Sequence, residues 1–258
     1  MSRMNNISMK QTIKYILITY FFFRFGNYIF LSLLETMKIQ VNYVYYFVSE
    51  MLFLVIPTLY FLRKMKITLK HDLKFKKIPI KNYFHLMILT ILFQPITHGL
   101  ITLLSELLND HSFQNYKYSY NSFIYFMTTS AIITPLIEEI WFRGLLFQKT
   151  KHLGSYKSIF FNGIVFGFIH LNIIEFSYTL LFGMLCCYVF YINKSLIAPI
   201  FLHVINNILQ NIPENNYTDI YYKFISNPIN IIPFIILSFL FIYYFSKRVK
   251  EKCLFQQL

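Results

Sequence analysis

The chain has 258 residues, of which 56% are hydrophobic and only 14% are charged, and its mean hydropathy is +0.49. Polar surface could hardly cover so much apolar material in water, so this composition excludes an ordinary soluble domain and predicts a membrane protein. The net charge of +13 would suit nucleic-acid binding in a soluble chain, but membrane proteins collect Lys and Arg in cytoplasmic loops, and we expect no nucleic-acid partner.

The expected helices are hydrophobic runs close to the roughly 20 residues that cross a bilayer. Eight such runs occur in chain order, at residues 12–34, 42–62, 83–105, 121–148, 157–173, 174–193, 195–212 and 229–246. The fifth to seventh are short and closely spaced, which leaves room for one of them to be tilted, broken or re-entrant. The sequence predicts an all-α, multi-pass membrane protein of about eight transmembrane helices, with residues 1–258 as a single membrane domain.

The basic residues predict how these runs cross the membrane. With eight crossings, 19 of the 24 Lys and Arg residues fall on one side, and only Lys38, Lys117 and Lys223 fall on the other. Because basic residues gather in cytoplasmic loops, both termini are expected in the cytoplasm. We expect a cell-membrane protein, or an endoplasmic reticulum protein in a eukaryote, with membrane lipid as a partner.

The fourth run, TPLIEEIWFRGLLF, carries three charged residues, although charges in hydrocarbon are costly and usually pair or do chemistry. Glu139 and Arg143 are four residues apart and share a helix face, which predicts a structural ion pair. Glu138 is rotated by about 100° from Glu139, so its carboxyl is expected to face a cavity. Pro135, just before them, is expected to kink the helix.

Two further charged residues lie well inside other runs, away from their ends. Arg24 interrupts the first run. Glu50 lies in the second run, which contains no basic residue that could pair with it. A pair between Arg24 and Glu50 across helices is the expected structural role, because an unpaired charge inside a membrane is costly.

The fifth and seventh runs supply histidines. Phe166 and His170 share one face of FNGIVFGFIHL, and Gly163 and Gly167 have the spacing that lets another helix approach closely. In APIFLHVINN, His203 and Asn207 share a face at a four-residue interval.

Depth in the membrane links these motifs. Measured along a helix from the nearest cytoplasmic lysine, Glu138, His170 and His203 lie at roughly 16, 20 and 14 Å. We therefore expect all three near the middle of the bilayer, although a lone intramembrane histidine commonly serves only an interhelical hydrogen bond.

Taken in order, the three motifs resemble those of the CAAX protease and bacteriocin-processing family, also called the Abi family. They are Glu138-Glu139-x-x-x-Arg143, Phe166-x-x-x-His170 and His203-x-x-x-Asn207, and the resemblance covers residues 121–212 as a catalytic core. It implies a type II CAAX prenyl endopeptidase-like intramembrane peptidase. Glu138 and His170 would activate a water, His203 and Asn207 would bind the oxyanion, Glu139 and Arg143 would give structural support, and Phe166 would pack the motif.

The resemblance leaves the substrate, the metal and the biological role open. A bacteriocin precursor, a pheromone precursor or a prenylated CAAX protein are the peptide or protein substrates it implies. We favour a mechanism without a cofactor, and the alternative is zinc held by Glu138, His170 and His203. A non-catalytic membrane regulator, a bacteriocin self-immunity protein and a proton-coupled transporter are the competing functions.

Overall fold

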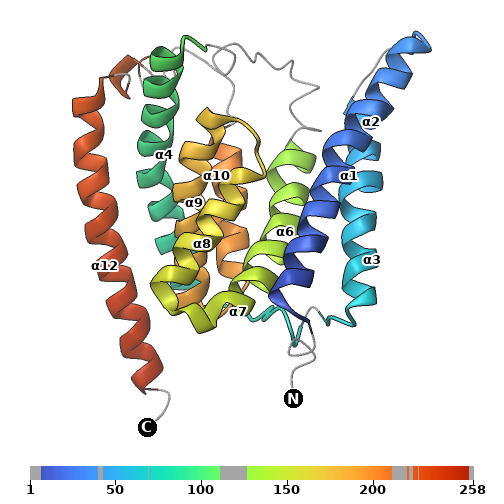
Figure 1. Ribbon diagram of the computed structural model, residues 1–258. Coiled ribbons are helices and arrows are strands. Elements are labelled where there is room, and N and C mark those ends of the chain that lie inside the picture. The colour runs from blue at the N-terminus through green and yellow to red at the C-terminus, as the bar shows by residue number, and fades with distance from the viewer. Residues whose placement is uncertain are drawn as a thin grey trace. The chain divides into compact units, whose positions relative to one another are not determined.

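A computed structural model describes residues 7–39, 43–68, 70–110, 127–210, 220, 223–225 and 227–255 (Figure 1). These residues form helices joined by turns, and this part of the chain contains no β-strand. Five of its helices are long and apolar enough to cross a membrane: Met9–Thr36, Val44–Lys64, Ile80–Leu108, Ile173–Asn193 and Ile229–Val249. The predicted class, an all-α multi-pass membrane protein, is confirmed.

The predicted number of eight crossings is not confirmed. The other three runs are helical too. The fourth is helical over residues 127–150 and carries the charged motif, and the remaining two are short. The helices Ser155–Phe168 and Ile197–Gln210 have 14 residues each. At 1.5 Å per residue such a helix extends about 21 Å, less than the roughly 30 Å hydrocarbon core.

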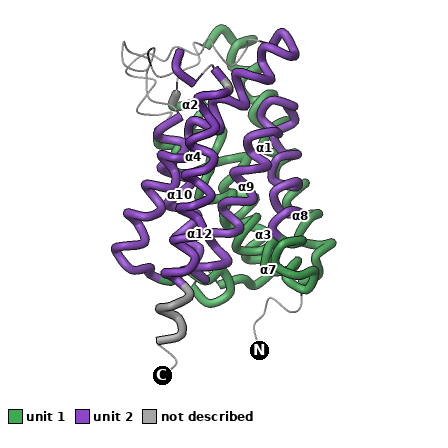
Figure 2. Tube along the Cα trace, turned by 90° about the vertical axis from the view of Figure 1, so that its left-hand side faces the viewer, with its two compact units in different colours: residues 1–76, 118–158 green, residues 77–117, 159–258 purple. Residues whose placement is uncertain are grey.

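The chain divides into two compact units, which Figure 2 shows in different colours. Unit 1 comprises Met1–Lys76 and Tyr118–Ser158, and unit 2 comprises Lys77–Lys117 and Ile159–Leu258. Each unit therefore combines two stretches that are separated in the sequence. The motif glutamates belong to unit 1 and the motif histidines to unit 2, and a single membrane domain over residues 1–258 stays a prediction.

In unit 1, helix α1 (Met9–Thr36) packs against α2 (Tyr43–Glu50) and α3 (Ile56–Lys64) (Figure 1). A reciprocal cap starts α1: the Gln11 backbone N–H donates to the Ser8 hydroxyl at 3.1 Å, and the Ser8 N–H donates to the Gln11 side chain at 2.9 Å. These bonds satisfy two of the amide groups that every helix start leaves open.

The fourth run, also in unit 1, continues through Pro135 by changing its helical pitch. The π-helical segment η4 (Thr129–Ile133) precedes α6 (Thr134–Glu139), and a second, η5 (Ile140–Leu146), follows it before α7 (Phe147–Thr150). Proline has no N–H to donate to the carbonyl four residues earlier, and its ring clashes with that carbonyl. An ordinary α-helical turn accommodates this clash poorly. The wider π turns take up this misfit, so the helix passes the proline with altered bonding and no break.

Unit 2 is organised around α4, which contacts α9, α10 and α12. Its helices are α4 (Ile80–Leu108), α8 (Ser155–Phe168) from Ile159 onward, α9 (Ile173–Asn193), α10 (Ile197–Gln210) and α12 (Ile232–Phe255), the last preceded by the 3₁₀ turn η7 (Pro228–Ile231). Figure 1 shows α4 beside α12, and the two are also joined by a hydrogen bond from the Ser238 hydroxyl to the Leu92 carbonyl at 3.3 Å.

Glycines bring α8 and α9 into close contact within unit 2. A Cβ on Gly163 would lie 2.9 Å from the Leu180 carbonyl oxygen, and one on Gly183 would lie 3.2 Å from the Gly163 Cα. A Cβ on Gly167 would lie 3.2 Å from the Phe176 carbonyl oxygen. The close helix approach predicted from the Gly163 and Gly167 spacing is confirmed, and its partner is α9.

Candidate active site

The carboxylate half of the candidate site lies in unit 1, on α6 and η5. Arg143 Nη1 donates to Glu139 Oε1 at 2.8 Å, and neither side chain has any exposed surface. Glu138, next in the chain, is also buried, with 6% of its surface exposed. The ion pair thus neutralises one buried carboxylate. Glu138 lies on a different side of the helix, because adjacent residues of a helix are rotated by about 100°.

Tyr20 of α1 faces Glu138. The tyrosine is buried, its ring centroid lies 6.1 Å from that of Phe142, and its hydroxyl is within interaction range of the Glu138 carboxyl. The contact is looser than a formed hydrogen bond, since the Tyr20 hydroxyl has no hydrogen-bond partner in the described part of the chain. The charge of Arg24, one helical turn further along α1, also acts on Glu138. Sequence reasoning missed Tyr20 because nothing in the first run distinguishes it from the other tyrosines.

The partners of the buried Glu50 carboxylate differ from the partner that the sequence predicts. Its carboxylate accepts hydrogen bonds from the hydroxyls of Thr134 and Thr129 on the fourth run. Arg24 is not among its partners, so the expected pair between Arg24 and Glu50 is wrong. Hydroxyl donors can satisfy a buried carboxylate without a second charge, and they come from a helix that is distant in the sequence.

The histidine half of the site lies in unit 2 and begins where α8 ends. The helix stops at Phe168, and His170 occupies the following turn, where its backbone N–H donates to the Gly167 carbonyl at 3.1 Å. Leu171 then takes a positive φ of 58°, and the chain turns into α9. The run expected to be helical from 157 to 173 therefore ends early, and a turn presents His170.

The ring orientation of His170 fixes its tautomer. Its Nδ1 lies 2.9 Å from the Phe166 carbonyl oxygen, which can only accept, so Nδ1 carries the hydrogen. In the neutral imidazole the lone pair is then on Nε2, which can accept a hydrogen bond from water or ligate a metal.

Aromatic rings hold His203 of α10 in place. His203 is buried with 4% of its surface exposed. Its ring lies edge-to-face with Phe182 at 4.9 Å and with Phe166 at 5.9 Å between centroids, and Phe166 also contacts His170 at 5.2 Å. Phe166 is thus in contact with both motif histidines, which lie on separate elements of unit 2.

Asn207 follows His203 by one helical turn, and its neighbour Asn206 is bonded to α4. Gln94 Nε2 of α4 donates to Asn206 Oδ1 at 2.9 Å, and Asn206 Nδ2 donates to Asn207 Oδ1 at 3.3 Å. Asn206 is rotated by about 100° from Asn207, so helix spacing alone does not place it on the face that His203 and Asn207 share. The sequence feature that could have indicated this contact is Gln94, a neutral polar residue within a mostly apolar run.

The zinc alternative draws on residues of both units. Within either unit taken by itself, the described residues include no group of three His, Cys, Asp or Glu side chains placed to hold a metal ion. Glu138 and the two histidines are chemically suitable ligands for zinc.

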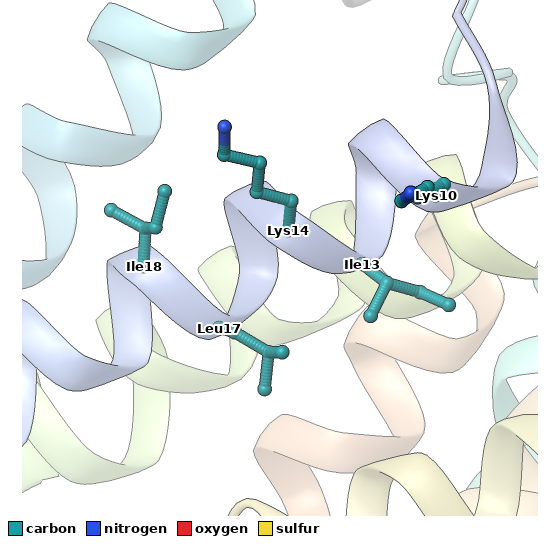
Figure 3. A pocket seen from close by; sticks show the side chains of 5 residues that line it. All are labelled: Lys10, Ile13, Lys14, Leu17 and Ile18. Atoms are coloured by element: carbon teal, nitrogen blue, oxygen red, sulfur yellow. The ribbon is translucent and has the colours of Figure 1, made fainter.

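A shallow surface depression lies elsewhere in unit 1, along the start of α1. Figure 3 shows its lining side chains, Lys10, Ile13, Lys14, Leu17 and Ile18, all from this one helix. No motif residue takes part. The two lysines lie one turn apart next to the apolar stretch, the pattern expected where a cytoplasmic helix end enters a membrane.

These observations define a multi-pass helical membrane protein with a buried glutamate beside an ion pair and two histidines packed on one phenylalanine. Residues 120–209 match the model of a protein family described as type II CAAX prenyl endopeptidase Rce1-like. The predicted resemblance to the CAAX protease family is thereby confirmed, and at family level this segment is similar to CAAX-type intramembrane proteases. No curated protein and no solved structure matches the chain.

Proposed function

We propose that the protein is an intramembrane endopeptidase that cleaves membrane-associated peptides or proteins, with Glu138 as the general base. The match of residues 120–209 to a CAAX endopeptidase family carries this proposal. The burial of Glu138 beside a carboxylate that Arg143 already neutralises supports it, because a carboxyl in an apolar bundle can take up a proton from water.

In this mechanism Glu138 removes a proton from a water that His170 orients through Nε2. The water oxygen attacks the scissile carbonyl carbon, and His203 and Asn207 donate hydrogen bonds to the resulting oxyanion. The carbon–nitrogen bond then breaks as the amine leaves with the proton that Glu138 received. Glu139 and Arg143 hold the helix and do not touch the substrate.

The test uses the full chain purified and reconstituted in lipid nanodiscs. The probes are a farnesylated peptide with a C-terminal CAAX sequence and the same sequence anchored by an acyl chain. In H₂¹⁸O, mass spectrometry should find two fragments, with one ¹⁸O in the new carboxyl group. Folded protein that cleaves neither probe would contradict the proposal and favour a non-catalytic membrane regulator.

The mechanism is proposed to need no metal ion. Asn207 beside His203 suits oxyanion donation better than metal ligation, and a carboxylate with an orienting imidazole can activate water unaided. Activity should survive exhaustive treatment with a chelator, and the purified protein should contain substoichiometric zinc. Activity lost to the chelator and restored by zinc, with one metal bound per chain and that metal lost in His170→Ala, would show a metallopeptidase.

A further inference from the structure

An amide side chain from α4 reaches the histidine half of the site. Gln94 is 7% exposed and lies in the apolar stretch before Pro95. Its Nε2 donates to Asn206 Oδ1 at 2.9 Å and approaches the Asn206 backbone oxygen at 3.5 Å. Since an unbonded amide in an apolar interior is costly, this bond fixes the Asn206 side chain in one orientation.

Asn206 passes this orientation on to Asn207. With its oxygen turned toward Gln94, Asn206 directs its Nδ2 group onward, and this group donates to Asn207 Oδ1 at 3.3 Å. A carboxamide has its acceptor and its donor on opposite sides. Because Asn207 Oδ1 faces Asn206, its Nδ2 donor group points the other way.

We propose that Gln94 and Asn206 are positioning residues that aim the Asn207 amide as a hydrogen-bond donor. This inference rests on the proposed oxyanion role of Asn207. Neither Gln94 nor Asn206 touches the substrate, and Gln94 lies outside the segment that matches the family model. The chain of amides explains why a polar side chain occupies a buried position of α4 facing α10.

The effect of breaking the chain should appear in turnover. Gln94→Met keeps the length and burial of the side chain but removes its amide, so Asn207 can rotate away from the developing charge. Because misplacing a catalytic group by about 1 Å can cost 10²-fold, we expect kcat to fall roughly ten- to hundredfold with KM nearly unchanged. Asn82→Leu is the matched control, since Asn82 on the same helix donates to Asn193 at 2.7 Å and bonds no motif residue.

A double-mutant cycle separates positioning from general destabilisation. In an Asn207→Ala background, which should itself lose about 10²- to 10³-fold in kcat, Gln94→Met should add less than about twofold. If Gln94→Met lowered kcat by the same factor with and without Asn207→Ala, the proposal would be overturned. Asn206→Ala should reproduce the Gln94→Met result, and it replaces that variant if Gln94→Met fails to fold.

The second measurement does not depend on activity. In protein labelled with ¹⁵N-asparagine, the side-chain NH₂ signals of Asn207, assigned by their loss in Asn207→Ala, should shift in Gln94→Met and stay in place in Asn82→Leu. Unchanged signals in Gln94→Met would overturn the amide chain. An inactive wild-type protein in which the signals do shift would instead refute the proposed peptidase function while leaving the amide chain in place.

Discussion

Single side chains decide most of the chemistry proposed for this protein, and the buried ion pair shows how much depends on each. Arg143 and Glu139 have no exposed surface, so removing one of them leaves the other charge uncompensated in an apolar bundle. Removing both leaves no charge behind. The two kinds of variant therefore have different expected consequences for folding.

Arg143→Met should lower stability by about 3–5 kcal/mol, because it strands the Glu139 carboxylate. The double variant Glu139→Gln with Arg143→Met should recover much of that loss. Yield of monodisperse protein and its thermal unfolding in detergent measure both effects. An Arg143→Met protein that folds as well as the wild type but has no activity would assign Arg143 a direct role in catalysis.

Tyr20 should matter for activity more than for folding. Its buried hydroxyl has no hydrogen-bond partner in the described residues, so Tyr20→Phe should change stability by about 1 kcal/mol or less. The same hydroxyl is a polar group that faces the Glu138 carboxyl, and its loss should lower kcat roughly tenfold by making the surroundings of the proposed base less polar. Tyr15→Phe is the control, because Tyr15 stacks on Phe61 at 4.6 Å and that contact needs no hydroxyl. Wild-type turnover in Tyr20→Phe would contradict this role.

The sequence predicts residues that act through local spacing and misses those that act across helices. Glu139 and Arg143 are one helical turn apart, so their pairing follows from helix geometry alone. The contacts that were missed join residues far apart in the sequence. Tyr20 faces Glu138, and Gln94 of α4 bonds to Asn206 of α10. The same reason made the expected partner of Glu50 wrong.

At the scale of helices, the α8–α9 hairpin carries His170 and presents Phe166 to His203 of α10. A Cβ on Gly183 of α9 would lie 3.0 Å from the Phe166 ring, so this glycine leaves room for the ring that contacts both His170 and His203. The glycine spacing predicted the close helix approach. Hydropathy did not predict that α8 stops at Phe168, because Ile169 and Leu171 in the following turn continue the apolar run.

Gly163→Ala should disturb this hairpin. The added Cβ would lie 2.9 Å from the Leu180 backbone oxygen, which cannot move without shifting α9, and overpacking of this kind costs about 1–3 kcal/mol. Gly99→Ala is the matched control, since its Cβ would first meet the mobile end of the Ile231 side chain. Thermal unfolding of the two variants compares them, and equal stability would show that the glycine contact is not tight.

At the scale of the whole molecule, access to the proposed site depends on how the chain crosses the membrane. The distribution of basic residues predicts cytoplasmic termini and a site that is reached from the cytoplasmic side or laterally within the bilayer. Hydropathy located the helical segments well, but the number that cross fully stays a prediction, since five helices are long and apolar enough and α8 and α10 have only 14 residues each. The π segments around Pro135 follow from local bonding that hydropathy does not detect.

Cysteines at exposed helix ends test the topology. Met37 is 68% exposed at the end of α1, on the predicted outer side, and His152 lies exposed after α7 on the predicted inner side. In intact cells an impermeant thiol reagent should label Met37→Cys and spare His152→Cys. The unsubstituted chain controls for the native cysteines, and the reverse labelling pattern would overturn the topology.

The central claim is that Glu138 does the chemistry, and comparing two isosteric carboxylate variants tests it most directly. Glu138 and Glu50 are both buried in unit 1, but hydroxyls already satisfy Glu50. With both variants folded in nanodiscs, Glu138→Gln should lower cleavage of the farnesylated probe by at least about 10²-fold, while Glu50→Gln should stay near the wild-type rate. Cleavage by Glu138→Gln at the wild-type rate would contradict the account.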